Sequence, residues 1–174
     1  GDTLAQLAEA GLDDYYHGEL AQTHAQFLED VGSPLRREDF AAYSARRVAP
    51  LSLQTAHGQL YNMIPPTQGM SSLAILGIFD KLGVKQAEGF DHWHGLIEAA
   101  KQAFIVRNAE LGDELSMLMP AQELLTTDRI EDMAKAINPR RALPWPHEPK
   151  EGDTIWMGAS DAQGTVVSFI QSVF

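Results

Sequence analysis

The chain has 174 residues, of which 44% are hydrophobic and 21% charged, the composition of an ordinary globular domain. Its formal net charge of −11 argues against a nucleic-acid or anionic-membrane partner, and no stretch reaches the ~20 apolar residues that a membrane helix needs. The absence of cysteine excludes disulfides, thiolate zinc sites and cysteine nucleophiles.

The first 141 residues predict a helical region that contains one small hairpin. Apolar residues at helical spacing indicate three helices before the hairpin and four after it. Those before it are 3–10, which Gly11 closes, 19–30 and 37–43. Those after it are 67–82, 90–111, 120–125 and 128–137. The hairpin falls within about 47–64, because strand-like segments flank the turn Ala56-His57-Gly58.

Within the helix predicted over 67–82, the apolar residues expected to be buried are Leu73, Leu76, Ile78 and Phe79, and Gly83 is expected to close the helix.

Residues 142–153 are rich in proline and charge, which is typical of an exposed, mobile linker. A core strand pair is expected to follow within 154–174. The sequence stops inside the second strand, an edge that natural domains usually cover or blunt. We therefore expect the chain to be a piece of a longer or processed protein.

The turn between these two strands predicts their register. A three-residue hairpin loop ends on a left-handed residue, and Gly164 suits that place after Ala162 and Gln163. Counting back from this loop, Thr154 pairs with Ser172, so one face carries two hydroxyls at its far end. The opposite face is apolar and pairs Met157 with Phe169 and Ala159 with Val167. A loop of two or four residues would instead pair Thr154 with Gln171.

A threonine at the start of a strand is more often structural than catalytic, but Thr154 directly follows an exposed linker. Breaking the Asp153–Thr154 bond would free an α-amine with a pKa of about 7.7–8.0 on the residue that carries the hydroxyl. That amine can act as general base for its own side chain. Gly152 would allow the strained backbone that such an attack on the preceding carbonyl requires. The arrangement is that of an N-terminal-nucleophile hydrolase.

Several segments, in order along the chain, resemble the γ-glutamyltransferase (γ-glutamyltranspeptidase) family, which includes cephalosporin-acylase-like enzymes. Residues 11–18 resemble the family's G-x-x-x-F-Y-x-G segment, and residues 35–43 its L-T-x-x-D-L-x-x-Y segment. Residues 64–69 resemble its P-P-P-S-S-G turn. Residues 98–107 match E-A-x-K-x-A-F-x-x-R closely, and Gly112-Asp113 follows as in the family.

The resemblance implies an α+β fold, part of an αββα sandwich, with 1–141 in the large subunit and 154–174 as the first hairpin of the small subunit. The family's D-x-x-G-x-x-V-S pattern fits Asp161, Gly164, Val167 and Ser168, which places the cleaved, nucleophilic threonine at Thr154. The hydroxyl that helps to position the nucleophile falls on Ser172. Cleavage is then expected between Asp153 and Thr154.

Two positions depart from the family. The second threonine that follows the nucleophile is replaced by Ile155, and an asparagine that contacts the γ-glutamyl head group is replaced by Phe174. A phenylalanine side chain forms no hydrogen bond to an amino-acid head group, so γ-glutamyl specificity is in doubt. The resemblance implies that the oxyanion-hole glycines and most substrate contacts lie outside the chain.

The expected activity is hydrolysis or transfer of γ-glutamyl amides such as glutathione. The alternatives are an amidase or acylase for another amide, favoured by Phe174, and an inactive structural fragment. The expected partners are a small-molecule amide and the remainder of the parent enzyme, without nucleic acid, membrane or cofactor. Compartment and oligomeric state stay open.

Two other groups of residues attract attention. His92 and His94 could suggest a metal pair, but residues two apart on a helix face different sides, so we expect ordinary histidines. Glu98 and Lys101, three apart on the same helix, are expected to form an ordinary surface pair.

Overall fold

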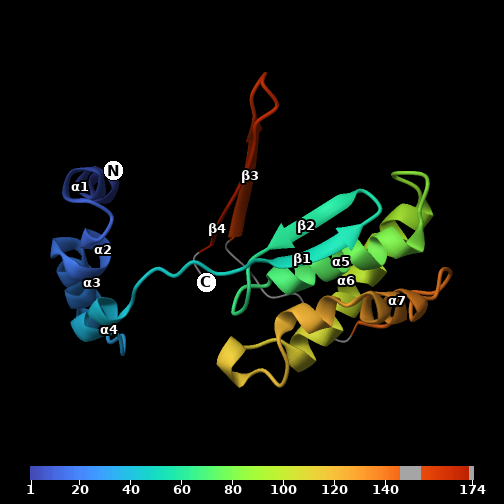
Figure 1. Ribbon diagram of the computed structural model, residues 1–174, viewed down its shortest axis with the longest axis horizontal. Helices are drawn as coiled ribbons and strands as arrows, with labels where there is room; N and C mark the ends of the chain where they lie inside the picture. The colour runs from blue at the N-terminus through green and yellow to red at the C-terminus, as the bar shows by residue number, and fades with distance from the viewer. Residues whose placement is uncertain (146–153, 173–174) are drawn as a thin grey trace. The chain divides into compact units, whose positions relative to one another are not determined.

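The structure is a computed structural model that describes residues 1–145 and 154–172. The chain forms two units, Gly1–Pro50 and Leu51–Phe174, each with its own internal contacts. Helices and antiparallel hairpins occupy separate segments, so the predicted α+β class is confirmed (Figure 1). No helix in the described ranges is long and apolar enough to cross a membrane.

The regular elements described in the first unit are all helices. It contains the predicted helices as α1 (Asp2–Ala10), α3 (Glu19–Asp30) and α4 (Arg37–Ala42). One further turn of helix, α2 (Asp14–His17), was not predicted, because four residues are too few to show a period. Gly11 closes α1 with a φ of +95°, as expected.

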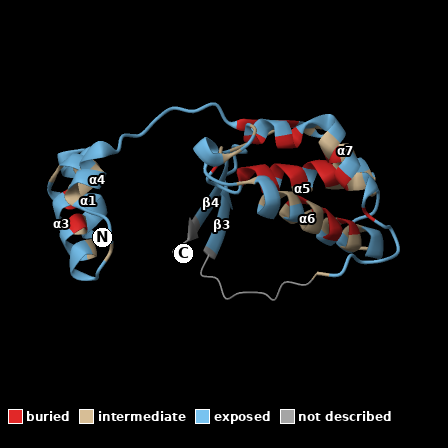
Figure 2. Ribbon diagram, turned by 90° about the horizontal axis from the view of Figure 1, so that it is seen from below, coloured by how far each residue is buried: buried red, intermediate tan, exposed pale blue. Residues whose placement is uncertain are grey.

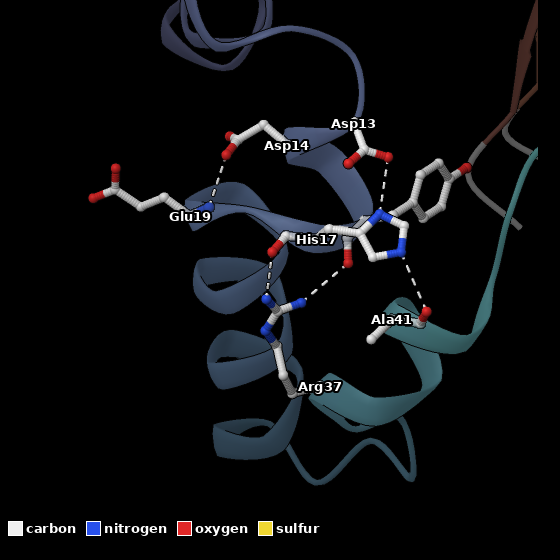
Figure 3. A network of polar contacts seen from close by, with 7 residues as sticks. Asp13, Asp14, His17, Glu19, Arg37 and Ala41 are labelled. Atoms are coloured by element: carbon white, nitrogen blue, oxygen red, sulfur yellow. Dashed lines mark hydrogen bonds and ion pairs between the residues drawn. The ribbon is translucent and has the colours of Figure 1, made fainter.

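A network of polar contacts ties α2 to α3 and α4 (Figure 3). The Asp14 carboxylate accepts hydrogen bonds from the backbone N–H groups of Glu19 at 2.8 Å and Leu20 at 3.2 Å. It therefore satisfies the N-terminal donors of α3 from outside that helix, the task of a capping side chain. Arg37 of α4 donates to the backbone carbonyls of Tyr16 at 3.0 Å and His17 at 2.6 Å.

The second unit begins with the hairpin of β1 (Leu51–Thr55) and β2 (Gly58–Asn62). The strands are antiparallel and pair Thr55 with Gly58 beside the turn. The predicted start near residue 47 is wrong, since the strand begins only after Pro50, a residue without an N–H for the ladder.

Helix α5 (Gly69–Leu82) is the centre of this unit and lies along β1 and β2 (Figure 1). It also packs against α6 (Phe90–Glu110), α7 (Thr127–Lys135) and the short 3₁₀ helix η2 (Ala121–Leu125). A second 3₁₀ turn, η1, spans Glu114–Ser116. The helices predicted over 120–125 and 128–137 are thus a 3₁₀ helix and a shorter α-helix.

The core is formed where α5, α6, α7, η2 and β1 meet, and its buried residues are coloured red in Figure 2. Leu73 and Ile78 are fully buried and Phe79 packs on the core as a partly buried side chain, as predicted. Leu76 is 48% exposed, so its predicted burial is wrong; it lies two residues before the buried Ile78 and therefore on nearly the opposite side of α5 from it. Gly83 closes α5 in the left-handed conformation with a φ of +63°, as predicted.

Candidate active site

The last described hairpin consists of β3 (Thr154–Ser160) and β4 (Val166–Ser172). Its loop is the three-residue type: the Asp161 N–H donates to the Thr165 carbonyl at 3.1 Å and Gly164 takes a φ of +87°. The Asp161 carboxylate accepts from the N–H groups of Thr165 and Gln163, each at 2.9 Å. Hydrogen bonds from Thr165 and then Gln163 and Gly164 outweigh desolvation and hold the pKa of Asp161 below its usual value.

The predicted register is confirmed by the backbone pairing. Thr154 pairs with Ser172, and Gln171 pairs with Ile155, which excludes the alternative register. The apolar pairs Met157–Phe169 and Ala159–Val167 also form as predicted. For Thr154 and Ser172 the described feature is this backbone pairing; their catalytic roles stay predictions. Asp153 and Phe174, named at the sequence level, lie outside the described residues.

Trp156 identifies the face to which positions 154 and 172 belong. Its Nε1 donates to Ser168 Oγ at 2.8 Å, and its ring lies so close to Gly158 that an added Cβ would stand 2.9 Å from Cη2. Side chains alternate along a strand, so positions 154, 156 and 158 share one face with 168, 170 and 172. Trp156 therefore lies on the same face as the expected nucleophile position, and its indole is directed towards Gly158 and Ser168.

The beginning of the predicted linker is exposed at residues 142–144, as expected, and is also hydrogen-bonded to α6. Leu143 is bonded to α6 through both of its backbone groups: its N–H donates to Glu98 Oε2 at 3.0 Å, and its carbonyl accepts from Lys101 Nζ at 2.7 Å. The Trp145 ring lies 6.4 Å from that of Phe104. Residues 146–153, the rest of the predicted linker, lie outside the described residues.

Glu98 and Lys101 form an ion pair at 2.6 Å, but the expected surface location is wrong. Their side chains are only 2% and 15% exposed. Sequence reasoning missed this because only the (i, i+3) charge pair was considered. The available signal was the line of small residues Gly95, Ala99 and Ala103, which marks the buried side of α6 and includes position 98.

His92 and His94 make ordinary packing and hydrogen-bond contacts. The His92 ring lies edge-on to Phe79 at 5.3 Å, whereas the His94 ring stacks on Phe90 at 5.0 Å and its Nε2 lies 2.8 Å from the Asn138 carbonyl. Over residues 1–145 and 154–172, no group of three His, Asp or Glu side chains is arranged to hold a metal ion.

A surface cavity at the corner between α5 and α6 is lined by Lys85, His94 and Arg140, among others. It includes no residue of the β3–β4 hairpin. This cavity is therefore not lined by the expected nucleophile.

The family model of γ-glutamyltranspeptidase matches residues 1–174, the whole chain. The chain belongs to this family. The γ-glutamyltranspeptidase resemblance inferred from the sequence is thereby confirmed, and so is its relation to acylases of the same fold.

Among curated relatives, the oxamate amidohydrolase proenzyme of Klebsiella pneumoniae is 43% identical over 172 residues, covering 99% of this chain and 33% of the relative. The glutathione hydrolase-like YwrD proenzyme of Bacillus subtilis is 33% identical, with the same coverage. This member of the γ-glutamyltranspeptidase family thus spans about a third of the length of the relatives it matches.

Among solved structures, the cephalosporin acylase from Bacillus halodurans superposes with a TM-score of 0.77 at 30% identity, over 98% of this chain and 31% of that chain. The Helicobacter pylori γ-glutamyltranspeptidase gives a TM-score of 0.70 at 23% identity, over 82% of this chain and 42% of that one, which is a likeness of fold.

Proposed function

We propose that the full-length protein is an amidohydrolase that matures by cutting its own Asp153–Thr154 bond and then uses Thr154 as its nucleophile. The observation that carries this proposal is the backbone pairing of Thr154 with Ser172 at the start of β3. It brings a second hydroxyl-bearing residue directly opposite the residue that the family pattern assigns as nucleophile. Relatives described as proenzymes support maturation by cleavage.

Self-processing needs only the chain and one water molecule. Thr154 Oγ attacks the carbonyl carbon of Asp153 and its proton passes to the departing amide nitrogen, so that an ester replaces the peptide bond. Water then hydrolyses the ester, which leaves a carboxylate on Asp153 and a free α-amine on Thr154. Because that amine has a pKa of about 7.7–8.0, a substantial fraction is neutral and basic near pH 7.5.

Turnover then repeats the same chemistry on a substrate. The Thr154 amine accepts the proton of its own hydroxyl as Oγ attacks the amide carbonyl, and the same proton is delivered to the leaving amine or ammonia. Water hydrolyses the acyl ester, or another amine accepts the acyl group. Ser172 is assigned a positioning role, as the hydrogen-bond partner of the nucleophile.

The substrate that we favour is a small amide without a γ-glutamyl group, of the oxamate kind. The identity of 43% to an oxamate amidohydrolase proenzyme exceeds the 33% to the glutathione hydrolase-like proenzyme of Bacillus subtilis and the 32% to the glutathione hydrolase proenzyme of Escherichia coli. Phe174 stands where the family has the asparagine that contacts the γ-glutamyl head group. An apolar residue there would leave that amino-acid head group without one of its hydrogen bonds. The loss of such a hydrogen bond strongly lowers the kcat/KM of an enzyme for the affected substrate.

The second candidate is hydrolysis or transfer of γ-glutamyl amides such as glutathione. It is favoured by the family match over the whole chain and by the glutathione hydrolases among the relatives. The third reading, an inactive structural unit, predicts neither cleavage nor turnover.

The full-length protein and its Thr154→Ala and Thr154→Ser variants test the proposal. Intact mass and N-terminal sequencing are expected to show a chain that begins at Thr154 in the wild type and an uncut precursor in Thr154→Ala. Turnover of oxamate, followed as ammonia release, is expected to exceed turnover of a γ-glutamyl anilide, followed as release of the aniline. The reverse preference would establish the second candidate, and turnover that survives Thr154→Ala would show that the nucleophile is misassigned.

A further inference from the structure

Glu98 is a buried carboxylate that the proposed chemistry does not use. It is 1% exposed and, with Ser71, makes up the buried polar or charged residues of the described ranges. Burying an ionised carboxylate is costly unless it is paired and hydrogen-bonded. The partners of Glu98 therefore indicate what this buried charge holds in place.

Those partners are Lys101 and one backbone segment. Lys101 Nζ lies 2.6 Å from Glu98 Oε1, and the Leu143 N–H donates to the other carboxylate oxygen at 3.0 Å. Lys101 Nζ also donates to the Leu143 carbonyl at 2.7 Å. Three charge-assisted bonds thus form a closed ring, which we call the Leu143 clamp, made of Glu98, Lys101 and the backbone of Leu143.

The clamp is the last of a series of contacts that lead the chain away from α7. The Asn138 carbonyl lies 2.8 Å from His94 Nε2, and the Asn138 side chain accepts from the N–H groups of Arg140 and Arg141 at 2.9 and 3.0 Å. After the clamp, Trp145 contacts Phe104, whose ring lies 4.0 Å below the Arg107 guanidinium carbon. The segment 138–145 is thereby fixed along α6.

A clamp on backbone groups determines both the position and the direction of the chain at Leu143, whatever the side chain there. Leu143 precedes Thr154 by eleven residues, so the bond proposed to be cut must lie within about 40 Å of the clamp, at ~3.3–3.6 Å per residue. The clamp is thus a polar attachment that lies eleven residues upstream of Thr154.

We propose that Glu98 and Lys101 are positioning residues for self-processing, which fix the point and direction from which the segment carrying Asp153–Thr154 leaves the folded body. The inference rests on the proposed function, since it requires cleavage at that bond. After cleavage the same ring holds the new carboxyl-terminal segment of the first fragment on α6.

The size of the decrease in processing rate, when the clamp is broken, distinguishes a positioning role from simple tethering. If release of Leu143 also releases Trp145, the next attachment upstream joins Asn138 to His94, sixteen residues before Thr154. Lengthening a flexible tether from eleven to sixteen residues lowers the probability of closure only about twofold. Loss of a defined direction costs far more, because small misplacements of reacting groups can slow a reaction about 100-fold.

The test uses the full-length protein and follows the disappearance of precursor with time. Lys101→Met and Glu98→Gln each break the ring. The double variant Glu98→Leu/Lys101→Met also breaks it but leaves no lone buried charge, and proteins usually tolerate such apolar replacement of a buried ion pair. Lys81→Met is the matched control, because Lys81 forms an exposed ion pair with Glu131 at 2.9 Å that holds no backbone segment. Melting temperature and turnover per cleaved molecule are measured for each variant.

We expect processing to slow at least tenfold in all three clamp variants, with faster amide hydrogen exchange at Leu143 and no slowing in Lys81→Met. Turnover of the molecules that do mature should stay near the wild-type value. Processing slowed by twofold or less in the folded double variant would overturn the inference. Slower processing accompanied by a lower melting temperature and a lower turnover per cleaved molecule would also overturn it. If Thr154→Ala itself is processed, the proposed function fails instead, which distinguishes the two failures.

Discussion

The indole of Trp156 donates to Ser168 Oγ at 2.8 Å and lies against the Cα of Gly158 on the face that also includes positions 154 and 172. The absence of a side chain at position 158 is what lets the indole lie flat there. The shape of this face next to the expected nucleophile is therefore determined by a glycine and a tryptophan together.

Gly158→Ala in the full-length protein should displace the indole, because the new Cβ would stand 2.9 Å and 3.1 Å from two of its carbons. We expect the ratio kcat/KM for the amide substrate to fall about tenfold or more, since misplacements of about 1 Å near a reacting centre are costly. Steady-state kinetics of the matured enzyme measure this. Ser160→Ala, at the turn end of the same strand, is the control and should leave kcat/KM unchanged.

Ser172→Ala tests the partner of Thr154. Loss of one positioning hydrogen bond should lower kcat up to about tenfold, the factor that a net contribution of 0.5–1.5 kcal/mol allows, and leave KM nearly constant. Processing should continue, because Thr154 and its carbonyl target are intact. Wild-type kcat in Ser172→Ala would contradict the assigned role.

The pH dependence of stability should reveal the Leu143 clamp. Burial raises the pKa of Glu98, but the Lys101 ammonium and the Leu143 N–H outweigh it and bring the pKa below its ordinary value of 4.5. The unfolded state thus takes up a proton first, so the stabilisation is complete above pH 4.5 and declines as the pH falls through the lower, folded value.

Urea denaturation of wild type and Glu98→Gln measures this difference. At pH 7 the variant should be less stable by about 1.5–3 kcal/mol, and the gap should narrow below pH 4.5. A gap that stays constant between pH 7 and pH 3 would show that the charge of Glu98 contributes nothing.

Gly69, the first residue of α5, is packed against backbone. An added Cβ would overlap the carbonyl oxygen of Met63 and stand 2.9 Å from Asn62 Oδ1. Gly69→Ala should therefore lower the free energy of unfolding by about 1–3 kcal/mol. Gly112→Ala is the matched control: a Cβ there meets nothing within 4 Å, so the change should stay within about 0.5 kcal/mol.

Asp14→Ala removes the side chain that caps α3 from a distance. Two backbone donors, those of Glu19 and Leu20, lose their acceptor, so the first unit should lose about 0.5–2 kcal/mol of stability. Hydrogen exchange at the first turn of α3 should become faster. Glu9→Ala, at an exposed position of α1, should leave that exchange unchanged.

The features that the sequence predicted well depend on local rules. The pairing of Thr154 with Ser172 follows from one residue, Gly164, whose left-handed conformation determines the loop length and hence the whole register. Helix α3 was predicted with its observed ends, Glu19 and Asp30, because polar and glycine-containing segments flank it. The family follows from motifs spread over the chain.

The features that it missed depend on contacts between distant segments. The partner of Glu98 is Leu143, 45 residues later, and no pattern within α6 predicts that this segment returns to the helix. Leu76 was expected to be buried because it is apolar, yet the core of α5 uses the side that carries Met70, Ala74 and Gly77. The roles of Thr154 and Ser172 stay predictions, since chemistry depends on side chains and substrate rather than on register alone.

The composition of the β3–β4 hairpin makes this part of the chain prone to aggregation. Neither strand contains a charged residue or a proline, and large apolar side chains such as Trp156, Phe169 and Ile170 are 50–65% exposed. Uncharged strands with exposed apolar side chains and unpaired edges are the usual starting points of aggregation. During synthesis, this hairpin emerges after the helices of residues 1–145, and its exposed apolar side chains are then open to contact with other chains. The segment that begins with the proposed nucleophile is therefore also the one for which we expect the greatest need of a chaperone.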